Sequence, residues 1–138
     1  LTAPPYESVY TSEERILMQE ARDSAVKYYR TEGLALPPSN TIPEDHISFE
    51  LQFMALMAER AAAALEDGNE EEACRAISVQ QTLLTEHLAT WVPSFVEDIL
   101  THAKTDFYQG VAFLMQGFID DEQSFLGTLT QHVGIEAA

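Results

Sequence analysis

The sequence predicts an all-α protein, a single bundle of about five helices formed by 138 residues. Three observations predict this fold class. Apolar residues recur at spacings of three and four, proline and glycine divide the chain into blocks, and no pair of segments shows the alternation typical of strands. Because 46% of the residues are hydrophobic, a chain of this length can bury one core. We therefore expect a single helical domain over residues 1–138.

The first long helix is expected over residues 12–32. Thr11 and Glu14 form a capping-box pattern at its start, and Gly33 suits its end. Its inward face is expected to carry four residues at helical spacing: Leu17, Ala21, Ala25 and Tyr28. Three prolines within "LPPSNTIP" then predict a loop over residues 33–42, because proline lacks the amide donor that a helix needs.

The second helix is expected from Pro43 to Glu66. Proline suits the first helical turn, and Gly68 suits the position after the last turn. The apolar residues predict a core stripe of Ile47, Leu51, Met54, Ala58, Ala62 and Leu65, widened by Phe49, Phe53, Leu56 and Met57. A helix this apolar must be buried on more than one side.

The third helix is expected over residues 70–90, capped by Asn69. Its inward residues are Ala73, Ile77, Leu84 and Leu88, followed by Trp91. Pro93 then predicts a chain break and a shorter helix over residues 93–103, with Phe95, Ile99 and Leu100 inward.

The last helix is expected over residues 106–129, followed by frayed residues 134–138. Gly110 and Gly117 lie seven positions apart in it, so they share a face. Two small residues on one face predict the close approach of another helix.

The charge balance restricts the partners. The chain has seven Lys and Arg residues and 23 Asp and Glu residues, which gives a net charge of -16. This charge repels nucleic acid and anionic lipid and favours cationic ligands such as arginine-rich peptides. The chain has no apolar run long enough for stable membrane insertion and does not start with a signal-peptide pattern. Cys74 is the only cysteine and is expected to be a small core residue, which excludes an internal disulfide and fits a reducing compartment.

Catalytic and metal chemistry find little support in the motifs. His46 and Glu50 are four positions apart, but the chain lacks the Glu-x-x-His pairs of two-metal bundles and the His-Glu-x-x-His motif of zinc proteases. His87 and His102 stand alone on separate predicted helices. Nucleophile elbows and glycine-rich phosphate loops are absent as well. The sequence therefore predicts no enzyme, no metal and no cofactor.

A peptide-binding surface is the remaining possibility. Pro5, Tyr6 and Tyr10 lie in a segment that cannot start as a helix, and aromatic and proline groups near carboxylates suit an apolar peptide with a basic end. The alternative is that this arm packs on its own bundle. In the same way, the segment from Glu44 to His46 forms either a clamp for a cationic ligand or a helix cap.

Four motifs in order then carry a resemblance: "PPYESVY", "PEDHISFELQFM", "HLATWVPSFVEDI" and "DFYQGVAFLMQGFI". Between Pro4 and Leu129 the chain resembles the TorD/DmsD family of redox-enzyme maturation chaperones. The resemblance implies an all-helical, cytoplasmic, non-enzymatic chaperone. It also implies binding to the twin-arginine leader peptide of a molybdenum-cofactor oxidoreductase, such as a trimethylamine N-oxide (TMAO) or dimethyl sulfoxide (DMSO) reductase. The chaperone holds this partner until its cofactor is inserted, before Tat export.

The resemblance, together with the residue types, predicts the peptide-binding site. Its residues are Pro5, Tyr6, Tyr10, Pro43, Glu44, Asp45, His46 and Trp91. The ring of Tyr6 replaces a tryptophan that some relatives carry. The family pattern has helices before "PPYESVY" that are missing here, so we expect exposed bundle faces that permit a homodimer or chain exchange. Two competing classes are an acidic helical module for oligomerisation or protein interaction, and a metal-dependent hydrolase.

Overall fold

The fold is all-α, as the sequence predicts. The structure is a computed structural model that describes residues 2–132, and it contains no strand within that range. The helical elements are α1 (Glu7–Thr11), α2 (Glu20–Thr31), α3 (Ile47–Glu66), α4 (Glu70–Leu83), the π-helical segment η1 (Leu84–Leu88), α5 (Ala89–His102) and α6 (Asp106–His132). The frayed end predicted at 134–138 lies outside the described residues.

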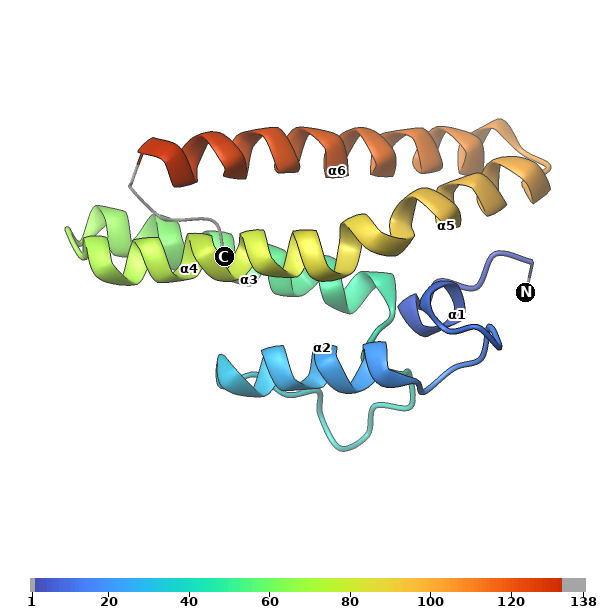
Figure 1. The fold of residues 1–138 in the computed structure, drawn as a ribbon, viewed down its shortest axis with the longest axis horizontal. Coiled ribbons are helices and arrows are strands. Elements are labelled where there is room, and N and C mark those ends of the chain that lie inside the picture. The colour runs from blue at the N-terminus through green and yellow to red at the C-terminus, as the bar shows by residue number, and fades with distance from the viewer. Residues whose placement is uncertain (1, 133–138) are drawn as a thin grey trace.

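The helices form three layers (Figure 1). α3 and α4 form an antiparallel hairpin, and η1 and α5 continue the path of α4. α6 packs along α4 and α5 on one side of this central layer, while α1 and α2 lie on the other side (Figure 1). Trp91, Met57 and Leu83 are fully buried and mark the core between these layers.

The first long helix begins later in the structure than the sequence predicts. Thr11 ends the short helix α1, where its hydroxyl donates to the Glu7 carbonyl (3.1 Å) instead of capping a following helix. Arg15 and Met18 have φ angles of 53° and 62°, which no α-helix accommodates. Helix α2 therefore begins at Glu20, and Leu17 of the predicted inward face lies outside it and is exposed.

The second predicted helix is also shifted at its start. Pro43 is not its first residue, because its carbonyl accepts from the amide of His46 in a turn (3.2 Å). Helix α3 starts at Ile47, and His46 is its N-cap: Nδ1 accepts from the amide of Ser48 (3.1 Å). A capping side chain satisfies a donor that the helix cannot, so it fixes the start of α3.

The predicted core stripe of α3 is partly wrong. Leu65 is 56% exposed, and Ala58 and Ala62 are exposed as well. The buried residues are Ile47, Glu50, Phe53, Met54, Met57, Ala61 and Ala64. One inward position of α3 is occupied by a carboxylate, Glu50. A prediction from apolar residues alone passes over it and therefore places the core stripe on neighbouring residues.

Pro93 does not break the chain. It lies inside α5, and the helical path from α4 to α5 is continuous through η1. A π-helical turn is wider than an α-helical turn, and it lies directly before the turn that contains the proline. The path bends in this region (Figure 1). The predicted inward residues Leu84, Leu88, Trp91 and Phe95 are all buried.

The outer face of α6 is apolar and uncovered by the described residues. Its large exposed side chains include Phe107, Val111, Leu114, Phe118 and Phe125. A Cβ atom at Gly110 or Gly117 would meet no described neighbour within 4 Å, so the predicted close approach of another helix is not found in this range. Cys74 is half-buried. A search of the described helices for one long and apolar enough to cross a bilayer finds none.

Candidate functional site

Two sequence motifs are joined by a short backbone pairing. The amide of Glu7 donates to the Asp45 carbonyl (3.1 Å), and the amide of Ile47 donates to the Pro5 carbonyl (3.0 Å). These bonds make an isolated antiparallel bridge between Tyr6 and His46. The structure therefore brings "PPYESVY" and "PEDH" together at one corner, which we call the Tyr6–His46 corner: Pro5, Tyr6, Pro43, Glu44, Asp45 and His46.

Aromatic rings make up the surface of this corner. The rings of Tyr6 and His46 meet edge to face at 5.0 Å between centroids, and Phe49 lies 6.1 Å from His46. Phe49 also lines a mainly apolar cavity of about 230 Å³ between α2, α3 and the loop that joins them. The other lining residues are Tyr29, Leu34, Ala35, Leu36, Gln52, Phe53 and Leu56. The half-buried corner thus continues into an apolar hollow.

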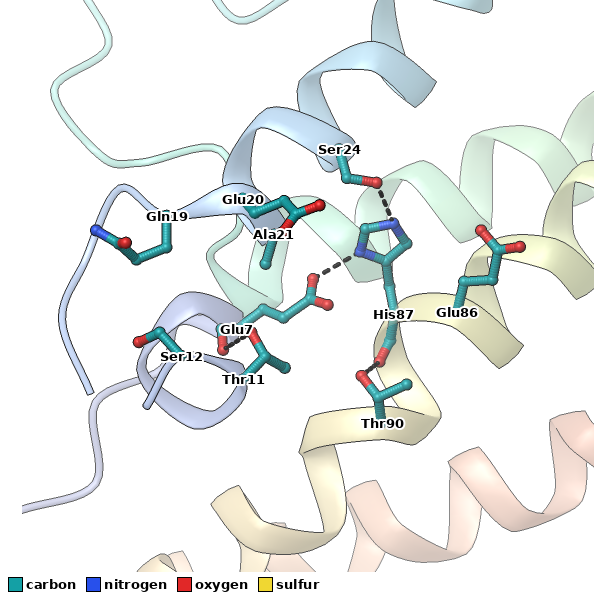
Figure 2. A pocket seen from close by; sticks show the side chains of 10 residues that line it. All are labelled: Glu7, Thr11, Ser12, Gln19, Glu20, Ala21, Ser24, Glu86, His87 and Thr90. Atoms are coloured by element: carbon teal, nitrogen blue, oxygen red, sulfur yellow. Dashed lines mark hydrogen bonds and ion pairs between the residues drawn. The ribbon is translucent and has the colours of Figure 1, made fainter. Parts of the chain in front are cut away.

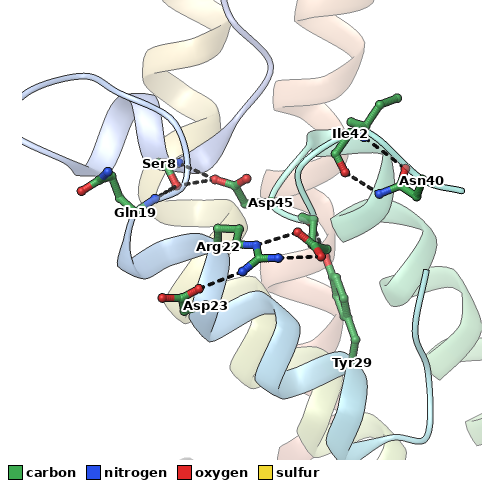
Figure 3. Close-up of polar contacts among 9 residues, drawn as sticks. Ser8, Gln19, Arg22, Asp23, Tyr29, Asn40, Ile42 and Asp45 are labelled. Atoms are coloured by element: carbon green, nitrogen blue, oxygen red, sulfur yellow. Dashed lines mark hydrogen bonds and ion pairs between the residues drawn. The ribbon is translucent and has the colours of Figure 1, made fainter. Parts of the chain in front are cut away.

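Asp45 lies beneath this surface. It is fully buried, and its Oδ2 accepts from both the amide (2.8 Å) and the hydroxyl (2.5 Å) of Ser8 (Figure 3). Ser8 in turn accepts from the amide of Gln19 (3.2 Å). Asp45 therefore holds the first turn of α1 and the chain after it in position, and its Oδ1 has no described partner.

Glu44 already binds a guanidinium group of the same chain. Its two carboxylate oxygens accept from Nε (2.6 Å) and Nη2 (2.8 Å) of Arg22 on α2. This bidentate contact lowers the pKa of Glu44 below its ordinary value. The Tyr29 hydroxyl donates to the backbone carbonyl of Glu44 (2.9 Å), so the corner is also held from α2.

The protonation state of His46 follows from its contacts. Burial lowers its pKa, although the charge of Asp45 opposes this shift. The neutral ring agrees with an Nδ1 that accepts from the amide of Ser48, and the proton then resides on Nε2. No described residue accepts from Nε2.

Tyr10 and Trp91 do not belong to the Tyr6–His46 corner. Trp91 is fully buried, and the Tyr10 ring stacks on it at 5.7 Å between centroids. The Tyr10 hydroxyl donates to Asp98 (3.0 Å), and burial next to this carboxylate raises its pKa. These two residues attach α1 to α5, so they lie in the packing behind the corner.

A second polar group, which the sequence patterns did not predict, centres on the contact between His87 and Glu7 (Figure 2). His87 is buried rather than alone: its Nδ1 is 2.7 Å from Oε2 of Glu7, and its Nε2 is 3.1 Å from the Ser24 hydroxyl. Trp91 donates to Oε2 of the buried Glu50 (3.1 Å). We call Glu7, Glu50 and His87 the Glu–Glu–His cluster. The sequence feature that could have indicated this cluster is Glu50, an acidic residue inside an apolar helix.

Burial and nearby carboxylates shape the electrostatics of this cluster. The pKa of Glu50 is raised well above its ordinary value, first by desolvation and then by Glu7. One donor atom from each of the three side chains lies within 4.8 Å of the others. The arrangement can hold a cation or share protons, and among the described residues the Ser24 hydroxyl and the Glu7 carboxylate lie within hydrogen-bond reach of the His87 ring.

Glu7 and His87 also line a polar cavity of about 450 Å³ (Figure 2). It lies between α1, α2 and η1, and its other lining residues are Thr11, Ser12, Gln19, Glu20, Ala21, Ser24, Glu86 and Thr90. Most of the lining residues carry a hydroxyl or a carboxylate group, so the cavity offers partners to polar or cationic species.

Comparison with known proteins gives the family. The family model described as nitrate reductase delta subunit matches residues 1–97, a range that includes all eight predicted site residues. The chain is 27% identical to "Chaperone protein TorD" of Vibrio cholerae over 130 residues, which is 94% of this chain and 57% of the relative. It is 29% identical to the TorD chaperone of Aliivibrio fischeri over 129 residues, or 91% of this chain and 57% of the relative.

A differently named chaperone matches as well. The chain is 28% identical to "Tat proofreading chaperone DmsD" of Salmonella typhi over 114 residues, or 83% of this chain and 49% of the relative. No solved structure matches the chain significantly. The chain thus spans about half the length of the curated relatives it matches, and these relatives are named as chaperones rather than enzymes. It belongs to the nitrate reductase delta subunit family and is a relative of the TorD and DmsD chaperones, as its motifs predict.

Proposed function

We propose that this chain is part of a cytoplasmic chaperone that binds the twin-arginine leader of a molybdenum-cofactor oxidoreductase, such as a TMAO or DMSO reductase. It holds the partner until the cofactor is inserted and the partner is folded, before Tat export. The single observation that carries the proposal is the bridge between Tyr6 and His46, which assembles two distant motifs into one aromatic corner. The name of the DmsD relative supports the link to Tat.

The apolar half of a leader fits beside the rings. Tyr6, His46 and Phe49 form a row of contacts that ends at the apolar cavity of about 230 Å³. Rigid rings give contact area at little cost in conformational entropy. The Nε2 proton of His46 supplies a donor for a backbone carbonyl of the peptide. Most of the affinity comes from the contact of the peptide with the three rings.

The basic half of a leader is recognised by charge. The ion pair between Glu44 and Arg22 supports this, because a carboxylate that already accepts a bidentate guanidinium has the geometry for another one. A leader arginine replaces Arg22 in the complex. The exchange contributes selectivity for arginine over lysine more than affinity, since one ion pair replaces another of the same kind.

Calorimetric titration with a synthetic twin-arginine leader tests the proposal. We expect the His46→Ala variant to weaken binding through loss of the ring, but this variant also removes the N-cap of α3. His46→Asn is therefore the sharper variant, because asparagine keeps a capping acceptor and loses the aromatic edge. Both variants should bind roughly tenfold more weakly than the unmodified chain, about 1.4 kcal/mol.

The matched control is His102→Ala. His102 is an exposed histidine on α5, far along the chain from the corner, whose ring bonds only to the Asp98 carbonyl among the described groups. It should leave the affinity unchanged. Equal affinity for the unmodified chain and a folded His46→Asn variant would remove the corner from the binding site, and no binding of any leader would overturn the function.

A second candidate function is self-association through α6. The exposed face holds three rows with a spacing of seven: Phe107 and Leu114, Gly110 and Gly117, and Val111, Phe118 and Phe125. Phe107 and Leu114 are 71% and 75% exposed. A second copy of this chain, related by a two-fold axis, would place α6 against α6 with the glycines at the crossing. This function is the acidic oligomerisation module, and it does not exclude leader binding.

Light scattering after size exclusion tests self-association. If the chain self-associates through α6, it forms a dimer that the Leu114→Glu variant converts to a monomer. The affinity between the two copies should rise with salt, because salt screens the repulsion between two acidic chains. An exposed site on α2, Lys27→Glu, serves as the control for added negative charge. A monomeric unmodified chain at all concentrations tested would rule this function out.

A further inference from the structure

Acidic side chains outnumber basic ones in the interior behind the Tyr6–His46 corner. Glu7, Glu50 and Asp45 are 3%, 0% and 0% exposed, so three carboxylates lie within the protein interior. In the described part of the chain no lysine or arginine forms an ion pair with any of them, and the one basic side chain in contact is His87, whose Nδ1 lies 2.7 Å from Oε2 of Glu7. A buried carboxylate is costly when it is charged and unpaired, so these acids either hold protons or bind a cation.

The Glu–Glu–His cluster provides donor atoms with the geometry of a cation site. One oxygen of Glu7, one oxygen of Glu50 and one ring nitrogen of His87 lie within 4.8 Å of one another, and all three residues are buried. Oε2 of Glu50 accepts from Trp91, while its Oε1 is buried with no hydrogen-bond partner among the described groups. A fully buried carboxylate oxygen without a donor calls for a partner, which is either a bound cation or a proton shared with the neighbouring Glu7.

The contacts around the cluster orient these donors. The Ser24 hydroxyl lies 3.1 Å from Nε2 of His87, and as an acceptor it would hold the proton on Nε2 when Nδ1 binds an ion. Nδ1 lies 2.7 Å from Oε2 of Glu7, a distance at which the two atoms share a proton that a bound ion would replace. An imidazole lone pair beside two carboxylates is a donor set of divalent transition-metal ions, and Zn²⁺ in particular accepts nitrogen and oxygen donors together.

We propose that Glu7, Glu50 and His87 bind one divalent transition-metal ion of the Zn²⁺ type. The three protein donors leave a fourth position for water, which the cavity of about 450 Å³ lined by Glu7 and His87 supplies (Figure 2). The same cavity provides the path by which the ion enters. Binding releases the protons that the cluster holds in the absence of metal.

The ion would connect three elements of the fold. Glu7 begins α1, Glu50 lies in the first turn of α3, and His87 belongs to η1. Because Glu7 follows Tyr6 directly, a bound ion would fix the corner from behind. The metal site does not depend on the proposed leader-binding function, and it is tested without a peptide.

The first experiment measures Zn²⁺ affinity by calorimetry on the chelator-treated full chain in competition with a chelator of known affinity. The unmodified chain should bind one ion per chain, and Glu50→Gln and Glu7→Gln should bind at least about tenfold more weakly. The control is Glu20→Gln, which removes a charge from the wall of the same cavity but from outside the cluster. It should stay within about twofold of the unmodified chain, because it removes no ligand.

A second measurement identifies a ligand directly and does not depend on loss of binding. His87→Cys, made in a Cys74→Ser background, should acquire a sulfur-to-cobalt charge-transfer band when Co²⁺ is added, while the Cys74→Ser background alone should not. Circular dichroism confirms that each variant is folded. Failure of the unmodified chain to bind Zn²⁺, or equal binding by a folded Glu50→Gln variant, would overturn the site and assign the neutralisation of Glu50 to shared protons.

Discussion

Three acids close together in the chain have three different environments. Glu44 is partly exposed and paired with Arg22, Asp45 is buried and accepts from Ser8, and Glu50 is buried against Trp91. The same chemical group therefore serves as an ion-pair partner, as a local brace for α1 and as a candidate metal ligand. Neighbouring donors and burial, rather than residue type, decide which role each acid has.

The ion pair at Glu44 predicts a pH dependence. Because its pKa is lower in the folded state than in the unfolded state, Glu44 stabilises the fold above its unfolded pKa. This contribution is lost as the pH falls through the folded pKa, on the acid side of its ordinary range. Glu44→Gln should cost about 1 kcal/mol at pH 7 and less in acid, since the pair is partly exposed.

Urea unfolding at several pH values checks this expectation. The two stability curves should converge as the pH falls, because protonated Glu44 and glutamine are both neutral. A difference between them that stays constant from neutral to acidic pH would show that Arg22 gains nothing from the charge of Glu44. Asp23→Asn, at the exposed second partner of Arg22, is the matched control and should change little.

At the residue scale, contiguous motifs were predictable and spatial partners were not. "PPYESVY" and "PEDH" identify Tyr6 and His46 because each motif can be read within a few residues. The pairing of these two residues requires the backbone bridge, which leaves no local signal. The partners of His87 come from α1 and α2, so a histidine that stands alone in the sequence becomes the centre of a polar cluster. The binding role of the eight predicted site residues stays a prediction.

At the element scale, the C-terminal end of α2 is held by one buried acid. Glu32, whose side chain is 4% exposed, accepts from Arg60 of α3 (3.2 Å) and Arg75 of α4 (2.6 Å). Arg60 also donates to the Glu32 backbone carbonyl (3.0 Å). This carboxylate therefore links α2 to both helices of the central hairpin, beside the packing of Tyr29 on Phe53.

Removal of this link should loosen α2. Glu32→Gln keeps the size and one acceptor but loses the charge, and it should destabilise the fold by about 1–2 kcal/mol because both arginines are partly exposed. Glu72→Gln is the matched control: Glu72 pairs with the same Arg75 at the surface. Thermal unfolding followed by circular dichroism should show a clear loss for the first variant only. Equal losses would indicate that Arg75 acts through Glu72.

Helix existence was predictable, whereas helix boundaries depended on tertiary contacts. The Asn69 cap was predicted and occurs, because the whole signal lies within four residues: Oδ1 accepts from the amide of Glu72 (3.2 Å). The start of α2 was mispredicted because Ser8 holds the amide of Gln19 in a non-helical position. Pro93 was mispredicted as a break because the π-helical segment before it has no simple sequence signature.

At the scale of the whole molecule, α3 to α6 form the larger body, and α1 and α2 attach to it at a few polar and aromatic points. The attachments of α1 are the bridge at His46, the contact of Glu7 with His87 and the stack of Tyr10 on Trp91. Those of α2 are the ion pairs of Arg22 and Glu32 and the packing of Tyr29 on Phe53. The apolar face of α6 lies on the opposite side of the molecule from α2 (Figure 1). A leader bound at the corner and a second copy bound at α6 would therefore occupy separate surfaces.

The distance along the chain between α1 and its partners sets an order of events during synthesis. Ser8 and Asp45 are 37 positions apart, Glu7 and His87 are 80 apart, and Tyr10 and Asp98 are 88 apart. A ribosome makes α1 first and its last partner much later, so α1 waits in an unpaired state while α3 and α4 form local contacts. The contacts of the Tyr6–His46 corner need the chain only as far as Ile47, whereas the contacts of α1 with His87 and Asp98 wait until η1 and α5 have left the exit tunnel. Translation speed through residues 47–98 thus determines how long the candidate binding surface stays without this support.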